Sequence, residues 1–208
     1  MRFKAFIDKD NNIIKLPCEV VRKYYKYQYS NWTQPTLTAN GTMGGNSFAC
    51  NQIASHTSST LAFRCFNGDV SSSGETNRWQ VNSVNTSSWY WLSWYNPQPL
   101  NITKLVITNA EASYCVKNYI IQGSDNNSNW VDIVSGTNTN TNGLSQWTIN
   151  MSNNEKAYKY HRIYCQPNNG ASLQIAEITI TATQRITTNG TKDNHDFYED
   201  RQQFYGIL

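Results

Sequence analysis

The sequence has few charged residues, and the residue types that favour long helices are sparse. Charged side chains make up 15% of the 208 residues, and the formal net charge is +3. So small and evenly spread a charge argues against nucleic acid as a partner. Ala, Leu, Glu, Lys and Arg are scarce, which argues against long helices. The chain has no run of about 18 apolar residues, so we expect no membrane span.

Motifs for catalysis are also missing. The nucleophile pattern GxSxG and the phosphate-binding pattern GxxxxGK[ST] do not occur. The three histidines, His56, His161 and His195, stand beside no serine or cysteine motif. His161 falls inside a strand pattern, which indicates a structural role. We therefore predict no catalytic residues and no enzymatic activity.

The five cysteines form no CxxC pair and no zinc-type spacing with histidine. The N-terminal residues MRFKAFID lack the apolar core of a secretory signal. These features predict synthesis in a reducing cytoplasm with free thiols.

Residues that favour strands and turns are abundant, and they predict an all-β protein with long polar loops. Aromatic residues make up 13% of the chain, and Asn, Ser and Thr fill much of the rest. Two apolar stretches flank the turn-rich residues 8–12 and predict an N-terminal hairpin arm over residues 1–30. Short β-rich runs over residues 31–183 predict one sandwich domain. Residues 184–208 form a polar tail with an apolar end, which we expect to dock on a neighbour or to lack order.

Two segments illustrate the strand pattern of the main domain. Residues 158–164 alternate aromatic and polar side chains, which is typical of a half-buried strand. Residues 121–130 read IQGSDNNSNW, in which Asp125, Asn126 and Asn127 suit a tight hairpin turn. Trp130 follows this turn and is predicted to return to the core as a large anchor.

Five segments in order resemble the galactose-binding-like fold of discoidin, F5/8 type C and family 32 carbohydrate-binding domains. They are AFRCFNGD at residues 62–69, NITKLVI at 101–107, the hairpin at 119–130, YKYHRI at 158–163 and Glu177-Ile178. The resemblance covers residues 31–183 and implies a jelly-roll or discoidin-like β-sandwich. Each segment alone is unspecific, but their order is specific.

The resemblance implies a structural Ca²⁺ site. Many family members hold this ion with the loop that matches Asn67 and Asp69 and with the glutamate that matches Glu177. Oxygen ligands suit this hard cation. Asn67 stands where the family has Asp, which removes a negative charge and weakens the site. The alternative is a metal-free Asx turn at Asn67 with Glu177 exposed.

The resemblance also implies a glycan site in the loops at one end of the sandwich. Such sites use an aromatic platform for the C–H face of a sugar and planar polar groups for its hydroxyls. The candidate residues on predicted loops are His56, Arg78, Trp79, Asn85, Trp89 and Tyr90. Burial in a core strand is the alternative for each aromatic ring in this set.

Discoidin-like domains of this Asn- and Thr-rich style resemble those of bacteriophage tail fibres, baseplates and capsid decorations. We therefore expect a non-catalytic virion protein, made in the host cytoplasm and present in many copies or as a homo-oligomer. The terminal arms would contact other virion proteins, and the sandwich would bind bacterial surface glycan. Two alternatives stay open: a structural decoration or adaptor protein without a sugar site, and a cellular carbohydrate-binding adhesin.

Overall fold

The computed structural model describes residues 5–7, 13–15, 27–52, 61–70, 77–152, 154 and 156–187. The described residues contain strands and short 3-10 helices but no α-helix, so the all-β prediction is confirmed. The strands are β1 (Ala5–Ile7), β2 (Ile13–Lys15), β3 (Tyr27–Trp32), β4 (Ala49–Gln52), β5 (Trp79–Asn82), β6 (Tyr90–Thr108), β7 (Val116–Ser124), β8 (Val131–Thr137), β9 (Gln146–Asn150), β10 (Tyr158–Pro167), β11 (Ser172–Ile175) and β12 (Glu177–Thr187). The 3-10 helices are η1 (Ala62–Phe66) and η3 (Ala112–Tyr114).

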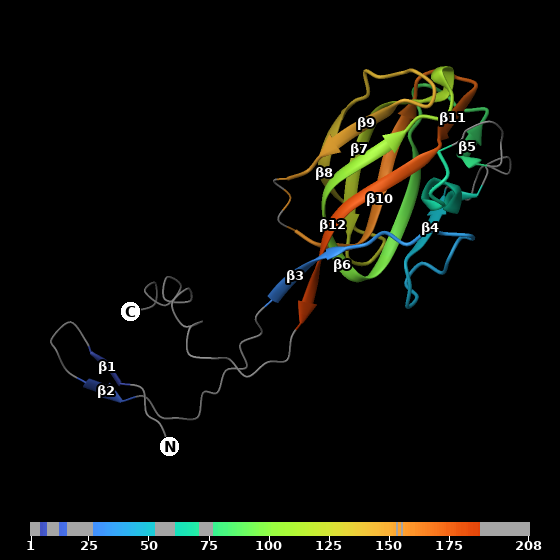
Figure 1. Cartoon of the computed structure of the whole chain (residues 1–208). Helices are drawn as coiled ribbons and strands as arrows, with labels where there is room; N and C mark the ends of the chain where they lie inside the picture. Colours follow the sequence, from blue (N-terminus) through green and yellow to red (C-terminus); the bar gives the residue numbers. More distant parts are fainter. Residues whose placement is uncertain are drawn as a thin grey trace. The chain divides into compact units, whose positions relative to one another are not determined.

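The long strand β6 takes part in both layers of a β-sandwich (Figure 1). Residues 90–95 of β6 pair with β4 on one side and β10 on the other. Beyond β10 this layer continues through β7 to the edge strand β8. Residues 100–108 of β6 pair with β12 and β9 in the second layer, in which β3 lies beyond β12. Pro97 and Pro99 lie between these two halves, where no ladder hydrogen bond is required of them.

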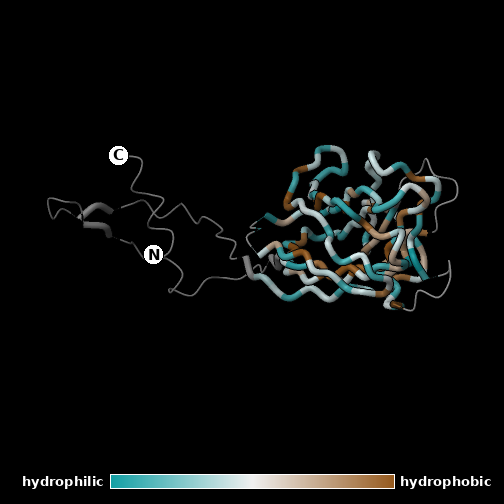
Figure 2. The backbone as a smooth tube through the Cα atoms, turned by 90° about the horizontal axis from the view of Figure 1, so that it is seen from above, coloured by the Kyte–Doolittle hydropathy of each residue, from teal (hydrophilic) through white to brown (hydrophobic). Residues whose placement is uncertain are grey.

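Side-chain alternation decides which residues of the strands form the core. In β10, His161, Ile163 and Cys165 are buried, whereas Arg162 and Tyr164 between them are half-buried on the outer face. Figure 2 shows hydrophobic and hydrophilic positions interspersed along the backbone of this unit. The core contains side chains from both layers, among them Trp94 and Leu105, because each layer buries its inward-facing set against the other.

A small third sheet pairs β5 with β11 and lies beside η1. Trp79 of β5 and Phe66 of η1 are fully buried and join this region to the core. Of the five cysteines, Cys50, Cys65, Cys115 and Cys165 are buried and free, as predicted, and Cys18 lies outside the described residues. Burial raises the pKa of the Cys50 thiol to about 12 and also raises that of Cys65. These thiols are therefore protonated and act as small apolar side chains.

The chain divides into two compact units. One is Tyr29–Ile186, which contains the sandwich, and the other combines Met1–Gln28 with Thr187–Leu208. In the second unit β1 and β2 pair antiparallel, with Phe6 opposite Ile14, so a hairpin is present where the sequence predicts one. The docking role of the terminal segments stays a prediction, and most of the C-terminal tail lies outside the described residues. None of the helices in the described part of the chain has the length and apolar character needed to cross a membrane.

Candidate functional site

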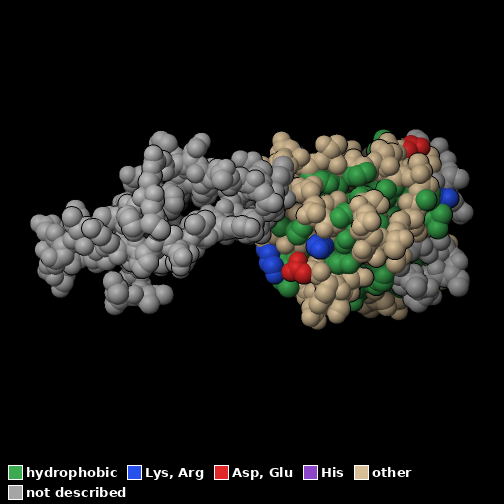
Figure 3. Space-filling model, turned by 90° about the horizontal axis from the view of Figure 1, so that it is seen from below, with side chains coloured by type: hydrophobic (Ala, Val, Ile, Leu, Met, Phe, Trp, Pro, Cys, Tyr) green, Lys and Arg blue, Asp and Glu red, His purple; other side chains and the backbone are tan. Residues whose placement is uncertain are grey.

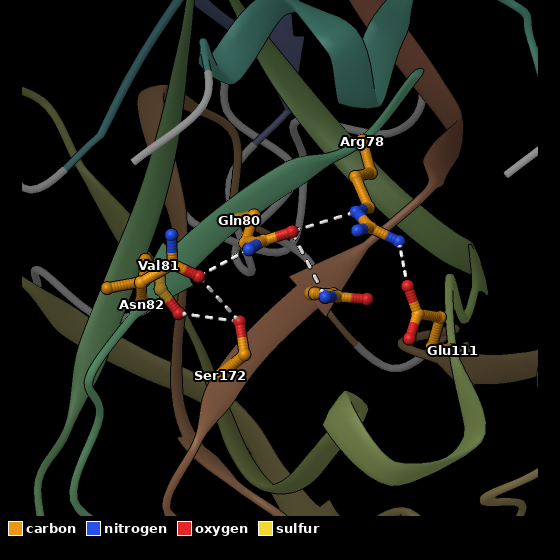
Figure 4. Close-up of polar contacts among 7 residues, drawn as sticks. Arg78, Gln80, Val81, Asn82, Glu111 and Ser172 are labelled. Atoms are coloured by element: carbon orange, nitrogen blue, oxygen red, sulfur yellow. Dashed lines mark hydrogen bonds and ion pairs between the residues drawn. The ribbon is translucent and has the colours of Figure 1, made fainter. Parts of the chain in front are cut away.

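Arg78 is buried and joined to its neighbours in a polar network (Figure 4). Its Nε donates a hydrogen bond of 2.8 Å to Oε1 of Gln80, and its guanidinium forms an ion pair with Glu111. Gln174 of β11 donates to the same Gln80 oxygen at 3.0 Å. These contacts join β5 and β11 to the residue that precedes η3. The predicted sugar contact of Arg78 is therefore corrected: its guanidinium connects parts of the fold.

Two of the predicted aromatic platforms are also internal. Trp79 is completely buried, and Tyr90 is 6% exposed. The Tyr90 hydroxyl accepts a hydrogen bond of 2.8 Å from the backbone N–H of Asn85. The tyrosine therefore stabilises the loop that contains Asn85. Both rings face the core because they begin strands whose inward positions are filled by large apolar side chains. As sugar platforms, Trp79 and Tyr90 were predicted wrongly.

Asn85 and Trp89 are the candidates that the structure leaves at the surface. Asn85 is exposed, and its side-chain oxygen accepts the backbone N–H of Ser87 at 2.8 Å, which shapes the turn before β6. Trp89 is half-buried and stacks on Tyr164 of β10, with ring centroids 5.1 Å apart and planes 26° from parallel. His56 lies outside the described residues.

An aromatic ladder continues from Trp89 across the outer face of the first layer. The Arg162 guanidinium lies between two rings, 5.0 Å from the centroid of Tyr164 and 4.3 Å from that of Trp130. Its Nε donates to Oε1 of Gln122 at 2.5 Å. Burial lowers the pKa of Arg162, and the negative charge that Asp132 carries opposes that shift. We call the set Trp89, Tyr164, Arg162 and Trp130 the outer ladder.

Arg162 and Tyr164 were not among the residues predicted for the site, and Trp130 was wrongly predicted to be a core anchor. Trp130 is half-buried against Arg162 on the outer face and is not part of the core cluster. The period-two alternation of residues 158–164 already puts Arg162 and Tyr164 on one face. What the sequence did not reveal is that Trp89 and Trp130 join that face from two other segments. Figure 3 shows one face of the sandwich, on which hydrophobic side chains lie among polar ones and charged side chains are few.

The predicted calcium residues come together at the loop after η1. Asn67 forms the expected Asx turn, because its side-chain oxygen accepts the backbone N–H of Asp69 at 2.8 Å. Gly68 has a φ of +76°, a left-handed conformation that favours glycine. Oδ2 of Asp69 accepts a hydrogen bond of 2.6 Å from Nδ2 of Asn77. The metal-free alternative predicted an Asx turn at Asn67 and an exposed Glu177. The turn is present, but Glu177 is buried.

Glu177 is 4% exposed, and its Oε2 atom has no hydrogen-bond partner among the described residues. Burial raises the pKa of its carboxyl to about 8. The backbone N–H groups of Gly68 and Asn67 oppose this rise, whereas the charge of Asp69 adds to it. Two neighbouring carboxylates, one with an unpartnered buried oxygen, suit a hard cation. In the described part of the chain no group of three or more His, Cys, Asp or Glu residues could hold a metal, so amide, backbone or water oxygens would complete the shell.

Comparison with known families identifies this architecture. A profile of the F5/8 type C domain matches residues 49–178, which span most of the sandwich, the Asn67–Asp69 loop and the start of β12. The chain belongs to the F5/8 type C domain family. The match confirms the predicted resemblance, and the F5/8 type C fold is the discoidin-like sandwich that the ordered sequence segments indicated.

Several solved structures are similar to this F5/8 type C domain at low sequence identity. A domain from Clostridium perfringens in complex with GalNAc-β-1,3-galactose has a TM-score of 0.51 at 14% identity, with 65% of this chain and 94% of that chain covered. The family 32 carbohydrate-binding module of C. perfringens NanJ, in complex with galactose, has a TM-score of 0.49 at 15% identity, with 67% and 93% covered. An F5/8 type C domain of Bacteroides fragilis has a TM-score of 0.48 at 16% identity, with 68% and 92% covered. Curated protein sequences give no significant match.

Proposed function

We propose that this F5/8 type C domain is a non-catalytic carbohydrate-binding protein whose saccharide site is the Trp89 end of the outer ladder. The observation that carries the proposal is the stack of Trp89 on Tyr164 beside the exposed Asn85. The stacked pair is a rigid ring surface for the C–H face of a sugar, and Asn85 offers an amide for its hydroxyls. Arg162 lies next to Tyr164 and extends the polar part of the surface.

A bacterial glycan array tests this site. We expect saturable binding of the purified full-length chain, and a loss of at least tenfold in affinity with Trp89→Ala and with Tyr164→Ala. Tyr29→Ala is the matched control, because Tyr29 is a 59% exposed ring on β3, in the other layer. A blank array at high multivalent protein concentration, or equal losses in the Tyr29 control, would refute the site.

The biological setting that we propose is a bacteriophage particle. The proposal rests on the resemblance of this Asn- and Thr-rich sequence to discoidin-like domains of phage fibres, baseplates and decorations. Many copies on one particle would turn weak sugar binding into strong attachment to host glycan. Antibodies against the purified chain should label intact particles of the phage that encodes it, and the absence of the chain from such particles would refute this setting.

A second candidate function is a structural virion protein without a sugar site. It is favoured by the burial of Arg78, Trp79 and Tyr90, three of the six residues that the sequence assigned to sugar binding. In this case particle labelling stays positive and the array stays blank. The two experiments together therefore separate the binding role from the structural role.

We also propose a calcium ion held by Asp69 and Glu177 with backbone oxygens of the Asn67 loop. The ion would neutralise the two carboxylates and occupy the unpartnered side of Glu177. Its function would be to hold η1 against the start of β12. The expected pH and calcium dependence of stability is given in the Discussion.

A further inference from the structure

Arg162 is the one cation of the outer ladder, and three contacts hold its guanidinium in place. The guanidinium carbon lies between two rings, 5.0 Å from the centroid of Tyr164 and 4.3 Å from that of Trp130. At one edge of the group, Nε donates a hydrogen bond of 2.5 Å to Oε1 of Gln122. A planar group that is fixed in this way loses little conformational entropy when a ligand binds to its remaining N–H groups.

Those remaining N–H groups, on Nη1 and Nη2 of Arg162, are not used within the described part of the chain. They make no hydrogen bond there, and the guanidinium forms no salt bridge with a described carboxylate. Neither nitrogen is among the buried atoms without a partner, so both are accessible to solvent. The side chain is half-buried, and burial lowers its pKa. The cation has thus lost part of its hydration and has no anion bound in return.

The strands on either side of Arg162 do not supply that anion. Its partners across the sheet are Gln122 of β7 and Ser93 of β6, and both are neutral. The neighbouring outward positions of β10 are tyrosines. Asp132 interacts electrostatically with Arg162, but its Oδ1 accepts a hydrogen bond of 2.5 Å from Nε2 of Gln122.

The hydrogen bond to Asp132 also decides how the Gln122 amide is oriented. Because Nε2 of Gln122 donates to Asp132, its Oε1 atom faces Arg162 and accepts from it. Asp132 itself is exposed at the surface of β8. Its charge favours the charged form of Arg162, yet the amide between them leaves the outer N–H groups of the guanidinium unpaired. The same charge opposes any anion that binds to Arg162, so its removal should strengthen anion binding.

The geometry of the guanidinium favours one class of anion. The outer edge of a guanidinium binds a carboxylate through two parallel N–H···O bonds that lie in one plane. Since the guanidinium of Arg162 lies between the rings of Tyr164 and Trp130, a planar carboxylate can continue its plane between them. A sulfate or phosphate group is tetrahedral and has oxygens outside that plane, which the rings disfavour.

We infer that the glycan bound at the outer ladder contains a sugar with a carboxylate, such as a uronic acid, and that Arg162 selects it. The inference rests on the proposed function, because Trp89 and Tyr164 would contact the C–H face of one sugar residue. Arg162 would pair with the carboxylate of the same or the next residue. The ligand is then an acidic polysaccharide.

An array that carries each bacterial polysaccharide in two forms tests the inference. One form is native, and in the other each carboxylate has been reduced to a primary alcohol, which removes the charge and keeps the sugar chain. We expect the full-length chain to bind at least one native acidic polysaccharide and to lose at least tenfold in affinity for its reduced form. Sulfated polysaccharides without carboxylates are the second arm and should bind at least tenfold more weakly than the native acidic polysaccharide.

Two variants with effects of opposite sign assign the selectivity to Arg162. Arg162→Met should bind the native and reduced forms equally. Asp132→Asn keeps an oxygen for Gln122 but removes the negative charge, so it should raise affinity for the native form by about twofold or more at about 0.15 M salt. Asp125→Asn is the matched control, because Asp125 is an exposed carboxylate whose partner is Lys156, and it should change affinity less.

Equal binding of the native and reduced forms, or stronger binding of sulfated polysaccharides, would overturn the inference and leave the proposed function standing. A blank array would refute both. A preference for the native form that persists in Arg162→Met would show that another cation selects the carboxylate. If Arg162→Met does not fold, Asp132→Asn decides, since no gain in affinity over the Asp125→Asn control would also overturn the role of Arg162.

Discussion

At the end of the sandwich that carries Arg78, Asn85 and Glu177, polar side chains mostly bind one another or the backbone. Elsewhere the side chains of Asn150, Ser152 and Tyr158 line a pocket and make no hydrogen bond to any residue that the structure describes. Of the described residues that the sequence marked as ligand-binding, none lines this pocket. A polar residue in a family motif can thus serve the fold.

Among the variants that test this difference, Trp79→Ala should cause the largest loss of stability. Trp79 was a candidate sugar platform but is fully buried, so its removal leaves a cavity. We expect a loss of about 3–5 kcal/mol in the free energy of unfolding, measured by urea denaturation. Trp89→Ala, which removes only a surface stack, should cost about 1 kcal/mol. Equal losses for the two variants would show that the two rings do not differ as the structure indicates.

The second effect concerns Glu177 and pH. The carboxyl has a pKa of 4.5 in the unfolded chain and about 8 in the folded one, so the folded state binds the proton more tightly. The contribution of Glu177 to stability is therefore fully present below about pH 4.5 and is lost as the pH rises to about 8. In chelator we expect a loss on the order of 2 kcal/mol over this window, allowing for solvent screening at the loop.

Calcium and a matched variant sharpen the Glu177 prediction. Calcium binds the charged carboxylate, so saturating CaCl2 should raise the Tm at pH 8 more than at pH 5. Glu177→Gln should remove both the pH slope in chelator and the response to calcium. If the variant keeps the slope, another group causes it, and if calcium leaves the wild-type Tm unchanged, the metal proposal fails.

The third effect is the opposite pH slope from His161. This residue is fully buried, stacks on Trp94 at 6.0 Å, and burial lowers its pKa from 6.5 to about 3. The unfolded chain takes up a proton that the folded chain excludes, so stability is lost as the pH falls from about 6.5 to about 3. At about pH 5 the loss should be about 2 kcal/mol.

His161→Phe keeps a flat ring in this position and has no proton to gain. Its urea midpoint should therefore fall less than that of the wild type between about pH 7 and pH 5. Identical acid slopes for the two proteins would assign the acid instability to carboxylates elsewhere.

Arg78→Met should cause a smaller loss of stability than the changes above. Met preserves most of the buried volume but removes the ion pair to the half-exposed Glu111 and one hydrogen bond to Gln80. Gln80 keeps its bond from Gln174, so we expect a loss of about 1–2 kcal/mol. Glycan affinity on the array should not change. A loss of glycan affinity at unchanged stability would show that Arg78 takes part in sugar binding.

The strand pattern and the family were predictable because both depend on local order. The alternation in YKYHRI puts His161 and Arg162 on opposite faces, since neighbouring residues of a strand face opposite sides, and the structure buries the His161 face. The Asx turn at Asn67 was predictable for the same reason, because donor and acceptor lie two residues apart. The ordered segments were specific enough to identify the F5/8 type C family.

The candidate site was predictable only in part. Asn85 and Trp89 are at the surface, as expected of a binding loop, but Arg78, Trp79 and Tyr90 are not. No local pattern distinguishes Trp79 from Trp89, since each stands next to a short run of strand residues. Their burial depends on η1 and β11, which cover one of them and not the other.

The sequence by itself determined the all-β class, the free thiols of the described cysteines and the alternating faces of the strands, because each follows from composition or from residues close together in the chain. Only the tertiary structure decided that Arg162 lies between Tyr164 and Trp130, that Glu177 is buried with an unpartnered oxygen, and that β8 and β9 border a pocket. The physical reason is that these features join segments tens of residues apart. Burial and hydrogen bonding between such segments are set by how the two layers pack, which no local pattern encodes.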